Sequence, residues 1–260
     1  MNRAERKRQA KLDEKLLQRG IDSASQDAEP IAAMARQLHG LLEGAREKAN
    51  IDAPVRFLHS KVEATLEATR ALPVACVKGC SHCCHSWVSA PAPEVLYIAK
   101  ALRAGMPQRA RVASAFAATK NLDVLTRKRH PVPCPLLEQD LCSLYGLRPM
   151  ACRFAASGDA AICLRVFREA SAEAIPSPVR NLRGRGAYQI ALGVALRGAG
   201  LPHAYYELNA ALNRALSRDD AEAAWLSGED IFFDVQRDPS DILQHPQAAM
   251  IYSMAFGERS

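Results

Sequence analysis

Apolar residues recur at three- and four-residue intervals through much of the chain, which is the spacing of helices that bury one face. The clearest stretches run from Ile31 to Asn50 and from Val55 to Leu72. Pro93 followed by residues 94–104, closed by Gly105, predicts another helix with proline in its first turn. Further helices are expected over residues 3–19, 106–126, 159–174, 188–197, 203–218 and 221–226. The pattern therefore predicts a mainly α-helical protein.

Alternating strand patterns are scarce. One short β-hairpin is predicted, with strands Cys134–Leu137 and Leu141–Tyr145 joined by a turn at residues 138–140. The prolines at 131, 133 and 135 end any helix before it, and the basic residues 127–130 are expected outside a helix as well.

Composition narrows the class of protein. The chain has 260 residues, 48% of them hydrophobic, and a net charge of +6, which is typical of a folded protein. No run reaches the roughly 18 apolar residues that cross a bilayer, and the N-terminus has no apolar segment typical of a secretion signal. We therefore expect a cytoplasmic protein without a membrane partner.

The eight cysteines gather between Cys76 and Cys163. In a reducing compartment such clustering favours metal ligands over redox thiols without metal or structural disulfides. Short spacings let one turn or helix face aim several thiolates at a single ion. Seven of them are the predicted metal ligands: Cys76, Cys80, Cys83, Cys84, Cys134, Cys142 and Cys152.

Neighbouring residues support this interpretation. Gly79 permits a tight turn beside Cys80, and Pro149 at a helix start would place Cys152 in the first turn, where the helix dipole favours a thiolate. The cations Lys78, Arg148 and Arg153 are expected to offset the negative charge of the thiolates.

Some positions stay open. Adjacent side chains diverge, so Cys83 and Cys84 seldom bind the same single ion: one is a ligand and the other packs or reacts, or there are two metals or a cluster. Cys163 lies in an apolar helical stretch and is a core residue or a ligand. His82 and His85 are expected to be exposed or to support the ligands without binding the metal.

The combined pattern resembles the YkgJ-type cysteine-cluster family, described as a zinc- or iron-chelating domain. The motif residues are Cys76, Cys80, Cys83, Cys84, Cys134-Pro135-x-Leu137, Cys142-x-x-Tyr145 and Arg148-Pro149-x-x-Cys152-Arg153. The resemblance covers about residues 74–165 and implies metal binding, with no assigned activity. Related patterns in flagellin lysine methylases imply an iron-sulfur cluster.

The predicted fold is a helical protein around a small cysteine-rich metal centre. Its regions are an N-terminal helical region (1–70), a metal-binding domain (71–170) and a C-terminal helical region (171–260), packed as one unit. The predicted function is binding of zinc or iron, with zinc ranked first; four thiolates would equally suit a [4Fe-4S] cluster.

Two alternatives remain. One is an iron-sulfur, redox or protein-modification enzyme related to the methylases, for which no catalytic residue stands out. The other is a zinc-stabilised module that binds nucleic acid or protein, suggested by basic segments at residues 1–20 and 100–130. Only 6% of residues are aromatic, so stacking platforms for bases are few and nucleic acid is not the expected partner.

Overall fold

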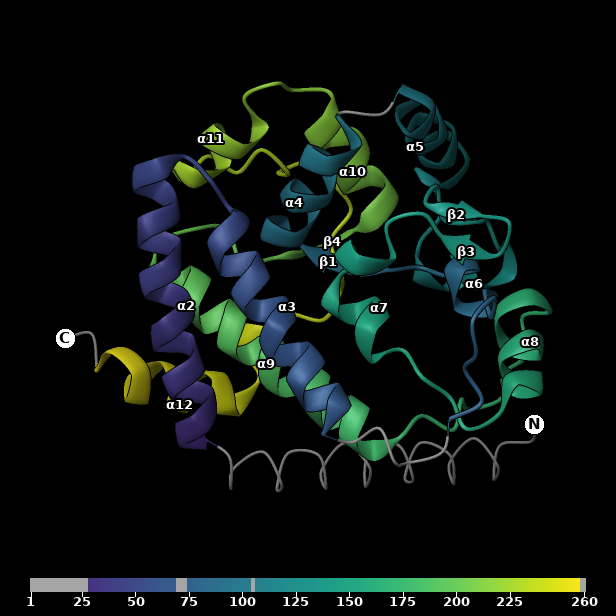
Figure 1. Ribbon diagram of the computed structural model, residues 1–260, viewed down its shortest axis with the longest axis horizontal. Coiled ribbons are helices and arrows are strands. Elements are labelled where there is room, and N and C mark those ends of the chain that lie inside the picture. The colour runs from purple at the N-terminus through teal and green to yellow at the C-terminus, as the bar shows by residue number, and fades with distance from the viewer. Residues whose placement is uncertain (1–27, 69–73, 104–105, 258–260) are drawn as a thin grey trace.

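The computed structural model describes residues 28–68, 74–103 and 106–257 (Figure 1). Helices dominate these residues, beside two short two-stranded sheets, which confirms the predicted mainly helical fold. The charged helix expected over residues 3–19 lies outside the described residues. None of the described helices is long and apolar enough to cross a bilayer.

Four helices pack together on one side of the molecule (Figure 1). They are α2 (Ala28–Lys48), α3 (Asp52–Glu67), α9 (Val179–Gly198) and α12 (Pro246–Phe256), the last preceded by the 3-10 turn η3 (Ile242–Gln244). α2 buries the stripe containing Leu38 and Leu42, as its periodicity predicts. α9 packs against α2, α3 and α12 and so lies at the centre of this group.

A second group continues the same apolar core. It consists of α4 (Ala92–Leu102), α5 (Met106–Thr119), α10 (Leu208–Leu216) and α11 (Ala221–Leu226). α10 contacts both α4 and α5, and Trp225 of α11 is fully buried. The Pro93 position in the first turn of α4 is as predicted.

A short buried ladder connects distant parts of the chain. β1 (Ser89–Pro91) pairs antiparallel with β4 (Tyr205–Glu207), with Ala90 opposite Tyr206. All six residues are buried. β1 follows the first cysteine run and leads into α4, so the ladder ties the cysteines to the C-terminal part of the chain.

The remaining elements form what we call the cysteine lobe, residues 74–88 and 124–171, whose outer part lies to the right in Figure 1. They are η1 (His82–His85), α6 (Val124–Arg129), β2 (Leu137–Glu138), β3 (Leu141–Cys142), η2 (Tyr145–Leu147), α7 (Met150–Phe154) and α8 (Ala160–Arg168). α7 contacts α3 and α9 and so joins this lobe to the helical body.

Several predicted boundaries were wrong. The helix expected over 106–126 is two helices, because Asp123 accepts a hydrogen bond from the Thr126 N–H and starts α6, which also makes residues 127–129 helical. The helix expected from 203 begins only at Leu208, because residues 205–207 pair with β1. α8 ends at Arg168, α9 begins nine residues earlier than expected, and α12 was missed.

Candidate metal centre

The first cysteine run is a turn followed by η1. The Cys80 N–H donates to the Val77 carbonyl at 3.0 Å, and Gly79 has a φ of +89°. That conformation is costly for any residue with a Cβ, which explains the glycine. The turn reverses the chain between Cys76 and Cys80 and leads into η1, which carries Cys83 and Cys84.

A Gly79→Ala variant should lose about 1 kcal/mol of stability, because a left-handed backbone costs an L-residue about 1–2 kcal/mol. A Cβ at position 79 would meet no heavy atom within 4 Å, so the cost is purely one of backbone conformation. Gly146→Ala is the matched control, since that position is equally open and has no positive φ. Equal thermal unfolding midpoints for the two variants would contradict the prediction.

The second cysteine run is the predicted hairpin, in a shorter form. Leu137 pairs with Cys142 and Glu138 with Leu141. The two connecting residues, Gln139 and Asp140, both have positive φ, which is the geometry of a tight two-residue hairpin turn. The Ser81 hydroxyl donates to the Asp140 carboxylate at 2.6 Å and fastens this turn to the first run.

One backbone hydrogen bond joins the two halves of the motif directly. The Cys134 N–H donates to the Cys84 carbonyl at 2.7 Å. Cys142 follows on the hairpin, and Cys152 is the third residue of α7, whose N-cap is Pro149. Proline therefore stands one position before the predicted one, yet Cys152 lies in the first turn as expected.

The thiols of this region influence one another electrostatically. Burial, together with Cys134, Cys83 and Cys142, raises the pKa of Cys152. A hydrogen bond with Cys84 and burial raise the pKa of Cys83, and burial raises that of Cys134 to about 11. Each thiol thus resists ionisation next to the others, and a bound dication would reverse that balance.

Arg148 opposes these increases. Its guanidinium acts against burial to lower the pKa of the Cys83, Cys142 and Cys152 thiols, as its predicted role requires. It stacks on the Tyr145 ring with 3.6 Å between the guanidinium carbon and the ring centroid. A fixed cation beside the thiols reduces the cost of gathering negative charge there.

Arg153, another of the three predicted cations, has a different role. Its guanidinium donates to the backbone carbonyls of Arg148 and Gly146, to the Glu63 carboxylate and to Nδ1 of His59. Because arginine only donates, Nδ1 of His59 accepts, and Nε2 of this neutral ring donates to Glu94 at 2.8 Å. Arg153 therefore anchors the loop before α7 to the helical body.

Glu94 completes this connection. It is fully buried, and its Oε1 also accepts the Met150 N–H at 2.7 Å. Met150 is the first residue of α7, so Glu94 satisfies an amide that the helix itself leaves free. The series of hydrogen bonds from Arg153 through His59 to Glu94 fixes the helix that carries Cys152.

Two of the positions left open by the sequence, Cys163 and His85, lie at the first cysteine run. Cys163 is buried in α8, which packs against η1. The N-cap of α8 is Asp159, whose carboxylate accepts the N–H groups of Ala161 and Ile162. His85 is buried with Nδ1 3.1 Å from the Ser81 carbonyl, which excludes exposure for this ring and leaves the alternative that it supports the ligands.

All eight cysteines are free thiols. The chain thus gathers soft sulfur donors of the type that zinc and iron-sulfur clusters use, beside a fixed cation. Across residues 28–68, 74–103 and 106–257, however, no three His, Cys, Asp or Glu side chains already stand in position to share one ion. The donor chemistry fits a metal, and binding would draw the thiols inward.

This joined motif agrees with a known family. Residues 75–171 match the CxxCxxCC model, described as a "putative zinc- or iron-chelating domain". The matched range includes all eight cysteines and confirms the resemblance predicted from the sequence. No curated protein and no solved structure matches the chain.

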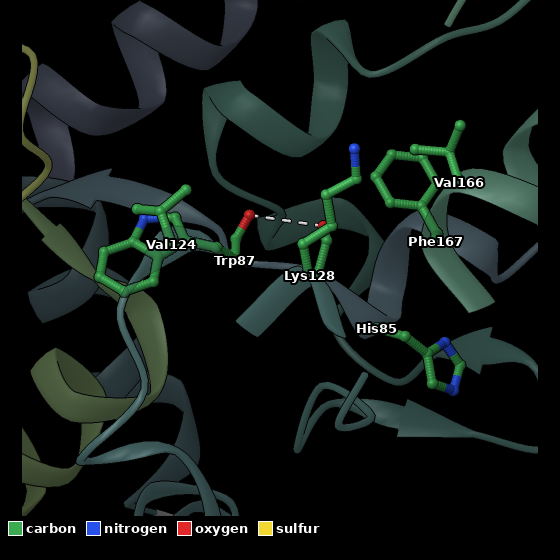
Figure 2. Close-up of a pocket in the computed structure, with 7 residues that line it drawn as sticks. His85, Trp87, Val124, Lys128, Val166 and Phe167 are labelled. Atoms are coloured by element: carbon green, nitrogen blue, oxygen red, sulfur yellow. Dashed lines mark hydrogen bonds between the residues drawn. The ribbon is translucent and has the colours of Figure 1, made fainter. Parts of the chain in front are cut away.

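The matched residues 75–171 also border a small apolar cavity of about 210 Å³ (Figure 2). It is lined by His85, Ser86, Trp87, Val124, Lys128, Val166 and Phe167. In Figure 2 Lys128 lies between Trp87 and Phe167. The lining comes from η1 and the residues after it, α6 and α8, so the cavity adjoins the first cysteine run.

Two important residues were missed from sequence. His59 lies outside the CxxCxxCC domain, and Glu94 lies in a helix between its two cysteine runs. One signal existed for His59: it sits on the stripe of α3 that buries Leu58 and Val62, where a polar side chain needs a partner. Glu94 resembled an ordinary first-turn acid, and only the packing of α7 on β1 and α3 reveals its partners.

Proposed function

We propose that the protein binds zinc or iron through the thiolates of Cys83, Cys134, Cys142 and Cys152, which we call the first centre. The observation that carries the proposal is the hydrogen bond between Cys134 and Cys84, because it fastens the two cysteine runs side by side. The mutual effects of these thiols on their pKa values support the same grouping.

This grouping favours Cys83 over Cys84 as the ligand of the first centre. Cys83 is the member whose thiol acts on Cys152, while Cys84 hydrogen-bonds to Cys83. Cys83 is therefore the ligand and Cys84 its neighbour. The bound ion would hold the hairpin, α7 and η1 together, so metal binding would also stabilise the fold.

The test is elemental analysis and an absorption spectrum of the full chain purified without oxygen. We expect the wild type to contain stoichiometric zinc or iron. In Cys142→Ser the metal content per chain should fall by about one zinc ion or one iron centre. Leu141→Ala, which changes the adjacent exposed residue of the hairpin, should keep the full content. Metal-free protein, or a Cys142→Ser variant with unchanged content, would refute the assignment.

A second candidate function is an iron-sulfur enzyme, favoured by the apolar cavity beside the first cysteine run. A [4Fe-4S] cluster would use the same four thiolates. The spectrum separates the two candidates, because a cluster gives a brown protein with broad visible absorption, whereas the zinc form is colourless. Stoichiometric zinc in colourless protein would eliminate the enzyme candidate.

A further inference from the structure

Two cysteines outside the first centre, Cys76 and Cys163, lie in segments that are joined by a second set of contacts. The Ala75 N–H donates to the Ser157 carbonyl at 2.7 Å, which places Cys76 beside the loop that leads into α8. Two residues after Ser157, Asp159 caps α8, and the Cys163 N–H donates to the Asp159 carbonyl. Cys76 therefore lies beside the segment that leads into the helix carrying Cys163.

The packing of α8 supports this arrangement. Cys163 and Val166 are on its buried face, whereas Leu164 is exposed, so the thiol points inward from a helix that packs on η1. Cys76 and Cys80 lie on either side of the Gly79 turn that leads into η1, so the packing of α8 on η1 brings Cys163 to the segment that carries them.

His82 supplies an independent observation. Its Nδ1 atom is buried and has no hydrogen-bond partner in the part of the chain that the structure describes. An unsatisfied buried nitrogen destabilises the fold, so such atoms usually have a ligand or partner. His82 lies between Cys80 and Cys83 in the segment against which α8 packs.

We propose a second metal centre in which Cys76, Cys80 and Cys163 bind a zinc-type dication with His82 as the fourth ligand. Three thiolates and one imidazole are an ordinary donor set for structural zinc. The proposal rests on the proposed function, in which the first centre binds the other ion. The two centres together use seven of the eight thiols, whereas one tetrahedral site needs four. Binding would release the three thiol protons to solvent as the thiolates take the dication, and it would satisfy the buried His82 nitrogen.

The test is native mass spectrometry of the full-length chain, prepared metal-free under reducing conditions and loaded with Zn²⁺ alone. We expect two zinc ions in the wild type and one in Cys163→Ser. Val166→Ala is the matched control, because it removes apolar volume from the same buried face of α8 and leaves every thiol in place. That variant should hold two ions.

The outcomes separate the two proposals. Two ions in Cys163→Ser, or one ion in the wild type that Cys142→Ser removes, would overturn the second centre and leave the first intact. Two zinc ions in the wild type, with one ion left in Cys163→Ser and one left in Cys142→Ser, would support the second centre. A wild type without zinc overturns both.

A measurement on the wild type covers the case in which Cys163→Ser does not fold. Cys76 is exposed, so iodoacetamide should alkylate it readily in metal-free protein. With Zn²⁺ bound, labelling of Cys76 should fall at least about tenfold, because a metal-bound thiolate is withdrawn from reaction. Unchanged labelling of Cys76 in the zinc-loaded protein would overturn the second centre.

Discussion

A Cys152→Ser variant is expected to lose the metal of the first centre and about 4 kcal/mol of stability. That free energy corresponds to a ligand present at about a thousand times its dissociation constant and bound only by the folded state. For a chain of this size it lowers the thermal midpoint by about 8–16 °C. Circular dichroism at fixed free Zn²⁺, combined with elemental analysis, measures both effects.

Met150→Leu is the control for Cys152→Ser. Met150 is buried in the same short helix, and exchanging it for leucine conserves volume and costs less than about 1.5 kcal/mol. This variant should keep its metal. If Cys152→Ser retained both its metal and the wild-type midpoint, Cys152 would not be a ligand.

Glu94→Ala should destabilise the protein by about 2–6 kcal/mol, since it leaves two buried donors unsatisfied and each costs about 1–3 kcal/mol. The substitution deprives both the His59 ring and the Met150 N–H of their acceptor. Since Met150 starts the helix that carries Cys152, zinc affinity should fall as well. Urea unfolding and a zinc titration measure the two losses.

Glu94→Gln separates the charge of this side chain from its hydrogen bonds. The amide oxygen can still accept from Met150, so this variant should lose markedly less stability than Glu94→Ala. If the two variants unfolded at the same urea concentration, the hydrogen bond to α7 would contribute nothing, and the proposed anchoring of Cys152 would be wrong.

Local periodicity predicted several helices well, because burial of one face determines them, but it missed the first half of α9. α2, α3 and α4 lie close to their predicted ranges, and α11 matches its range. The strand β4 was not predictable in this way: it has three residues, and its partner Ser89–Pro91 lies more than a hundred residues earlier. A ladder this short leaves no alternating pattern in the sequence.

In the candidate site, too, features set by neighbouring residues were predictable, and features set by the packing of distant helices were not. Spacing alone predicted which cysteines belong to the motif and that Cys152 starts a helix, since both are properties of neighbouring residues. It could not predict that Arg153 would bind His59, because that contact depends on how α3 and α7 pack. For Cys163 the decisive fact is the position of α8 against η1, which no local pattern encodes.

The β1–β4 ladder bears on how the protein can be divided. The family match ends at residue 171, yet β1 inside it pairs with residues 205–207, which lie beyond it. A fragment cut at the limits of the match would lose that strand partner, the Asn181 amide that donates to the Phe154 carbonyl, and the acceptor that His59 gives Arg153. We expect such a fragment not to fold on its own, so any shortened chain meant for biophysical work should retain both flanking helical regions.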